Sequence, residues 1–268
     1  MYMINFPPSF RWLQAASAAL LLSVSVSTQA ASAQWWNDIV NDRQDAVLRE
    51  LAKGQDPNAQ HEGQPAAMYA IQQDSWRVYD LLSQHRQFDW NQANTNNETV
   101  LMYLAIVGDQ ARVNTAIAQG AEVKRLGWTP LHYAASKGHT DIAQLLLQHG
   151  ALVNAPAPDG TTPLMMAALS GSRDMVTALI RAGADPRAEN LQGLTAADWA
   201  ENNNHSQLAQ ELNRLASGAT QATTVKQPSA SPESAPSATA PYSASKREAD
   251  APASEGSSSR YFDFERFN

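Results

Sequence analysis

Residues 127–135 read GWTPLHYAA, and the same pattern returns at 160–168 as GTTPLMMAA. A third and more divergent copy, GLTAADWA, lies at 193–200. The glycine that opens each copy follows the preceding one by 33 residues (160 − 127 = 33 and 193 − 160 = 33). A fixed period of this length predicts a repeat array, in which each unit buries its apolar face only against its neighbours.

A second shared string follows the first two copies. Residues 138–151 read GHTDIAQLLLQHGA, and residues 171–184 read GSRDMVTALIRAGA. The two strings together resemble the ankyrin repeat, a pair of antiparallel helices with a projecting hairpin finger. The resemblance implies an all-α solenoid, and weaker copies extend it toward the N-terminus. We expect one domain of six units over 35–216, with the boundaries 35–60, 61–94, 95–126, 127–159, 160–192 and 193–216.

Local signals support helix boundaries within the units. Thr129 can cap a helix whose first residue is Pro130, where the missing N–H of proline costs nothing. Gly150 is expected to end the second helix, where a left-handed residue is favoured. The counterparts 33 residues later repeat each of these signals.

The first 33 residues predict a secretory signal peptide. They contain one base, Arg11, and no acid, and an apolar stretch over 12–26 leads to the small-x-small site at 31–33. The apolar stretch is shorter than the ~20 residues that span a bilayer, but an uncleaved anchor stays as the alternative. We expect cleavage after Ala33, no membrane insertion afterwards, and a location in the bacterial periplasm or outside the cell. A chain without cysteine suits such an oxidising space.

The composition changes at residue 217. Residues 217–268 are rich in Ser, Ala and Pro, and we expect disorder over 217–259 because such a stretch buries too little apolar surface. Residues 261–267 read YFDFERF, with four aromatic residues in seven. We interpret this segment as a docking peptide for the protein's own groove or for a partner. A sticky, unselected segment is the alternative.

The sequence contains no GxSxG, P-loop or HExxH motif, so we expect no catalytic residue and no cofactor. The resemblance implies structural hydrogen bonding for His132 and His139, and no pair among the six histidines has a metal-ligand spacing. We therefore expect no metal site. A formal charge of −7 and a pI of about 5.3 argue against a nucleic-acid partner.

The place after the TPLH string lies on the inner helix, toward the concave face, in ankyrin proteins. A stripe of large side chains is therefore expected to line a protein-binding groove there. The finger between the third and fourth units is three residues shorter than the later ones, and cations lie beside it. The predicted groove and finger residues are Tyr69, Tyr103, Trp128, Tyr133, Lys137, Met166, Trp199, Lys124 and Arg125. The alternative is that the rings only pack between adjacent inner helices.

These observations predict a monomeric, non-enzymatic module that binds a protein partner in the bacterial envelope. The partner's identity does not follow from the sequence. The alternative function is a chaperone-like envelope protein that protects a partner enzyme or neutralises a toxin. An enzyme with an unrecognised site is the third possibility, and the lack of an acid–base–nucleophile constellation disfavours it.

Overall fold

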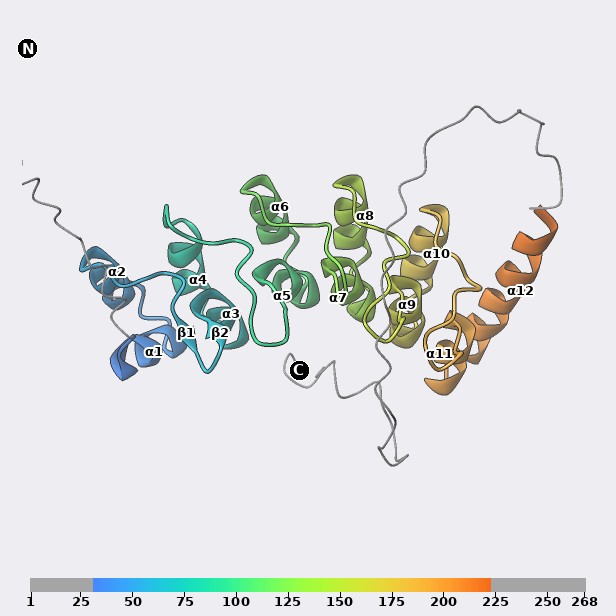
Figure 1. The fold of residues 1–268 in the computed structure, drawn as a ribbon, viewed down its shortest axis with the longest axis horizontal. Coiled ribbons are helices and arrows are strands. Elements are labelled where there is room, and N and C mark those ends of the chain that lie inside the picture. Colours follow the sequence, from blue (N-terminus) through green and yellow to red (C-terminus); the bar gives the residue numbers. More distant parts are fainter. Residues whose placement is uncertain (1–30, 223–268) are drawn as a thin grey trace, which may run out of the picture. The chain divides into compact units, whose positions relative to one another are not determined.

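The computed structural model describes residues 31–222. Over these residues the chain is an all-α solenoid, which confirms the predicted fold class. Figure 1 shows the helices stacked in pairs that follow one another in chain order. The predicted signal peptide up to residue 30 and the predicted tail from residue 223 lie outside the described residues.

Each pair has an inner helix, which packs against the inner helices of its neighbours, and an outer helix. The inner helices are α1 (Ala33–Val40), α3 (Ala66–Gln72), α5 (Val100–Val107), α7 (Pro130–Lys137), α9 (Pro163–Ser170) and α11 (Ala196–Asn202). The outer helices are α2 (Gln44–Ala52), α4 (Trp76–Ser83), α6 (Gln110–Ala118), α8 (Thr140–Gln148), α10 (Arg173–Arg181) and α12 (Ser206–Ala222). A short antiparallel hairpin pairs β1 (Gln60–His61) with β2 (Gln64–Pro65).

The core runs through the inner helices. In α5, every side chain from Val100 to Ile106 is buried, because this helix has neighbours on both sides. In α7, Ala134 and Ala135 have no exposed surface, and their small side chains let adjacent helices approach closely. The array is therefore stabilised by contacts between units as much as within them.

His132 links the start of one inner helix to the next unit. Its ring is fully buried, and Nδ1 accepts the backbone N–H of Thr129 at 3.2 Å. Nε2 lies 3.1 Å from the carbonyl oxygen of Thr161. Because a carbonyl can only accept, Nε2 carries the proton and the ring is the neutral Nε2–H tautomer.

Gly150 follows the end of α8 and has φ +85°, in the left-handed conformation that the sequence predicts.

Asparagine side chains after three of the outer helices form a bridge to the following unit. The amides of Asn58, Asn91 and Asn154 each donate to a backbone carbonyl and accept a backbone N–H of the following unit, at 2.7–3.1 Å. The corresponding position of the third unit is Lys124, whose side chain lies along Gly150. The shortened finger therefore replaces one of these amide bridges by an aliphatic contact.

Both ends of the array differ from the predicted boundaries. The last helix, α12, continues to Ala222, six residues past the predicted end of the array at residue 216 (222 − 216 = 6). The composition of 217–222 suggests a linker, but its alanines and glutamine are also good helix formers. At the other end α1 begins at Ala33, and the Ser32 hydroxyl accepts the backbone N–H of Trp35 at 3.2 Å. The predicted cleavage site thus lies in the first turn of this helix.

The buried His132 predicts a pH-dependent stability. Burial lowers its pKa from 6.5 to about 4. As the pH falls from 6.5 toward 4, the unfolded chain takes up a proton that the folded chain does not, so the free energy of unfolding falls. Between pH 7 and pH 5 this loss should be roughly 2 kcal/mol. Urea denaturation of the native chain and of His132→Gln measures it; the variant should show the flatter dependence, and equal slopes would contradict the assignment.

Candidate protein-binding surfaces

The predicted aromatic stripe does not form an exposed groove lining. Tyr103, Tyr133, Met166 and Trp199 are all buried, and Tyr69 is half-buried. Each of the four buried side chains belongs to an inner helix that packs on its neighbours, so the side chain fills the space between helices. The structure therefore places these residues in the core, which corresponds to the packing alternative.

Two of the stripe tyrosines meet a buried carboxylate that the sequence analysis missed. The Tyr133 hydroxyl donates to Oε1 of Glu98 at 2.6 Å, and the Tyr103 hydroxyl donates to Oε2 at 3.2 Å. Nδ2 of Asn94 donates to the same Oε2 at 2.6 Å. This network joins the third and fourth units through α5 and α7. The signal in the sequence is an acid directly before the capping residue Thr99.

The predicted cations and Trp128 have intramolecular contacts. Nη2 of Arg125 donates to Oδ1 of Asn97 at 2.9 Å, and only 11 % of the Arg125 side chain is exposed. Lys124 is exposed and lies along the neighbouring unit, while Lys137 is half-buried. Trp128 packs edge-on against the His132 ring, at 5.2 Å between ring centroids. Arg125 and Trp128 are therefore held by contacts within the array.

The most exposed apolar side chains lie on the fingertips. Leu126 is 89 % exposed and Leu191 is 81 % exposed. Between them lies the exposed Pro158 of the intervening finger. A Cβ placed on Gly127 would lie 3.8 Å from Cγ of Pro158, and the Leu191 N–H donates to the carbonyl of the residue after Pro158 at 2.9 Å. We call Leu126, Pro158 and Leu191 the fingertip ridge.

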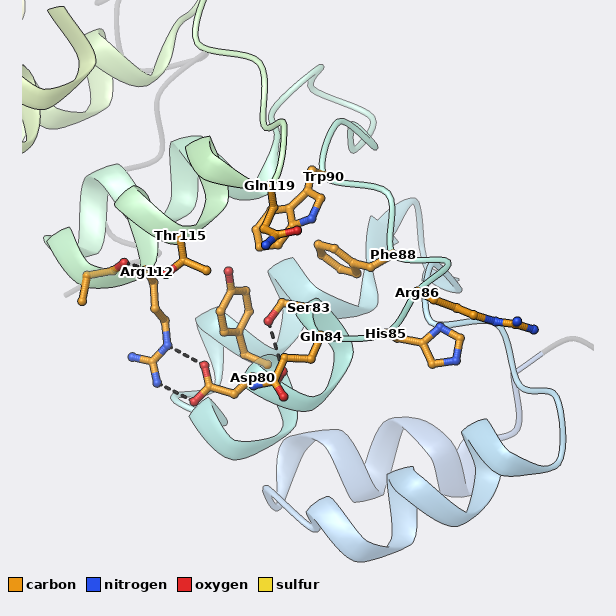
Figure 2. Close-up of a pocket in the computed structure, with 12 residues that line it drawn as sticks. Asp80, Ser83, Gln84, His85, Arg86, Phe88, Trp90, Arg112, Thr115 and Gln119 are labelled. Atoms are coloured by element: carbon orange, nitrogen blue, oxygen red, sulfur yellow. Dashed lines mark hydrogen bonds and ion pairs between the residues drawn. The ribbon is translucent and has the colours of Figure 1, made fainter. Parts of the chain in front are cut away.

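A pocket of about 800 Å³ opens between α4, α6 and the loop that follows α4. Figure 2 shows Phe88 and Trp90 beside each other on one side of this outer pocket, with Gln119 close to Trp90. The two aromatic rings are perpendicular, with 4.9 Å between their centroids. His85 and Arg86 lie at the outer end of the pocket (Figure 2). Aromatic, amide and guanidinium groups together make a surface suited to a peptide side chain.

The opposite wall of the outer pocket is a charge cluster. Arg112 donates through Nε and Nη2 to both carboxylate oxygens of Asp80, each at 2.8 Å, and its Nη1 also contacts Asp109. The hydrogen bond to Asp80 is the main reason why the pKa of Arg112 is raised. The guanidinium carbon lies 4.6 Å from the ring centroid of Trp76. Two carboxylates therefore balance the charge of Arg112, and its guanidinium group packs on an aromatic face.

His85, at the outer end of the pocket, is hydrogen-bonded to its own loop. Nδ1 of His85 accepts the backbone N–H of Gln87 at 3.3 Å. Within residues 31–222, no group of three His, Cys, Asp or Glu side chains is placed to hold a metal ion. None of the helices in that same range combines the length and apolar character needed to cross a bilayer.

Comparisons with known proteins identify the repeat. The family model described as ankyrin repeats (3 copies) matches residues 77–157, 102–190 and 152–220, which together cover more than half of the chain. BCL-6 corepressor-like protein 1 of Mus musculus is 46% identical over 78 residues, 29% of this chain and 4% of its own length. The Homo sapiens protein of that name is 42% identical over 70 residues, 26% of this chain and 4% of its own length.

A third similar protein is the 2-5A-dependent ribonuclease of Mus musculus. It is 46% identical over 48 residues, which are 16% of this chain and 6% of its own length. The matched part thus spans only a few per cent of the length of each of these curated relatives.

The Glu98 network predicts a stability difference between two tyrosines. Tyr133→Phe removes a hydroxyl that donates to the buried carboxylate, so the free energy of unfolding should fall by about 1–3 kcal/mol. Tyr69→Phe, on a half-buried ring against Trp36, should change it by less than about 0.5 kcal/mol. Urea denaturation of the full chain compares them. Equal losses would show that the contact between Tyr133 and Glu98 does not stabilise the array.

Proposed function

Because this chain belongs to the ankyrin-repeat family, we propose that it is a non-enzymatic module that binds a protein partner through its fingertip ridge. Ankyrin repeats generally mediate protein–protein interactions. Because the stripe is buried, the inner helices expose little side-chain surface that a partner could contact. The fingertips, in contrast, present apolar side chains to the solvent on three adjacent units.

The single observation that carries this proposal is the exposure of Leu126 and Leu191. Isolated exposed leucines are common, but contiguous apolar patches on a polar surface mark interaction sites. Pro158 lies on the finger between those of the two leucines, and the hydrogen bond from the Leu191 N–H to the Asp159 carbonyl joins the fifth finger to the fourth. Covering one such leucine contributes about 1.5–3 kcal/mol of binding free energy, so two of them would anchor a partner.

The proposed setting is the bacterial envelope, as a periplasmic or secreted protein. The signal-peptide pattern of residues 1–33 and the absence of cysteine from the sequence support this setting. Cleavage after Ala33 would remove the hydroxyl of Ser32 that caps α1. The intact mass of the exported chain tests the site: a start at Gln34 supports it, and a full-length chain in the membrane fraction contradicts it.

The fingertip ridge predicts site-specific capture of one partner. A photo-crosslinking amino acid at position 126 or 191 should capture the same protein in the native cell. The matched control is position 48 on α2, where the leucine is 50 % exposed. Capture of the same proteins at position 48, or of none at the ridge, would contradict the proposal. Many weakly captured proteins would instead favour the chaperone-like alternative.

The captured protein then allows an affinity measurement. Leu126→Ser and Leu191→Ser should each weaken binding by about tenfold, which corresponds to about 1.4 kcal/mol. The free energy of unfolding should change by less than about 0.5 kcal/mol, because both side chains are exposed.

A further inference from the structure

We propose that the aromatic segment 261–267 of this chain binds in cis to the outer pocket between α4 and α6. This interaction is separate from the fingertip ridge and does not depend on the proposed partner. From the sequence, this segment is predicted to dock on the protein's own groove or on a partner. Burial of the tyrosine stripe removes the expected groove, and the outer pocket provides an aromatic-lined alternative.

The pocket arises from a local departure from the repeat. The carbonyls of Gly120 and Gly183, which accept the bridging asparagines, follow the ends of α6 and α10 by two residues. In the second unit Gln87 takes this role, four residues after the end of α4 at Ser83. The longer loop carries Phe88 and Trp90, and both rings remain half-buried in the pocket wall. At about 800 Å³ the pocket lies within the ~300–1,000 Å³ range of ligand sites.

The side chains of the segment YFDFERF match the residue types that line this pocket. In an extended chain, alternate side chains point to opposite sides, so Phe262 and Phe264 share one side and Asp263 and Glu265 share the other. The phenylalanines match the aromatic wall. The carboxylates match Arg86, which is exposed at the outer end of the pocket.

The available cation is Arg86 rather than Arg112. Arg112 is already held by Asp80 and Asp109. Over residues 31–222, in contrast, no carboxylate lies within ion-pair distance of Arg86. A carboxylate of the segment would therefore gain an interaction at Arg86 without breaking an existing ion pair.

The linker length fits the span. Successive units repeat one arrangement, so the outer helices follow one another along the array in the order α6, α8, α10 and α12 (Figure 1). Three helix spacings of 8–10 Å separate α6 from α12, about 25–30 Å. The 38 residues from 223 to 260 would have a root-mean-square length of about 34 Å as a random coil (260 − 222 = 38).

A linker that matches its span gives an effective concentration on the order of 1 mM. A segment that binds with a dissociation constant of about 0.1 mM would therefore occupy the pocket about tenfold more often than it leaves it empty. A weak aromatic contact is thus sufficient for cis binding.

Disulfide trapping tests the proposal in the full chain, because its sequence contains no cysteine. Gln119→Cys places a thiol at the pocket, and Tyr261→Cys places one on the segment while keeping its three phenylalanines. The matched control is Ala182→Cys with Tyr261→Cys. Ala182 is exposed, precedes its glycine as Gln119 does, and lies closer to the linker. In a glutathione buffer, the 119–261 pair should form the intrachain disulfide about tenfold more favourably than the 182–261 pair.

Three other results of this experiment would each overturn part of the proposal. Replacing Phe262, Phe264 and Phe267 by Ser should reduce the 119–261 disulfide to the control level, and an unchanged yield would overturn aromatic recognition. Equal yields for the two cysteine pairs would overturn the pocket as the site. Disulfide-linked dimers that increase with protein concentration, without the intrachain product, would show that a second copy supplies the segment and would overturn the cis assignment.

Discussion

The structure depends on the burial of each inner helix between the inner helices of its neighbours. A unit of two short helices cannot bury its apolar face alone. The side chains of α5, α7 and α9 therefore pack against the inner helices of the adjacent units. This constraint explains why the tyrosine stripe is buried. A large side chain on the inner helix is used as packing, and the surfaces left for partners are the fingertips and the outer helices.

The two proposed binding surfaces lie where the repeat is irregular. The shortened third finger ends in the exposed Leu126 and has Lys124 where the first, second and fourth units have a bridging asparagine. The lengthened loop after α4 brings Phe88 and Trp90 to the outer pocket. In regular units, the backbone N–H and C=O groups form the same hydrogen bonds from one unit to the next. A change in the length of a finger or loop therefore alters the surface, while the packing of the core is maintained. Glu98 is a related change inside the array, where a carboxylate joins two units.

Much of the fold could be predicted because period and capping residues are local signals. The 33-residue spacing gave the helix pairs, and Thr129 with Pro130 marked where α7 begins. Whether a side chain is buried cannot be predicted from neighbouring residues alone. The burial of Tyr133, for example, depends on the packing of α5 and α9 beside its helix. The helical part of α12 beyond residue 216 was missed because alanine suits both helix and linker.

We propose that a partner contacts the fingertip ridge, while the tyrosine stripe packs between the inner helices. Hydrogen–deuterium exchange of the full chain, measured with and without the protein captured at position 126, separates these two surfaces. We expect added protection at 124–128, 157–161 and 190–194, with α5, α7 and α9 unchanged. Added protection confined to the outer helices, or none at the fingertips, would contradict it.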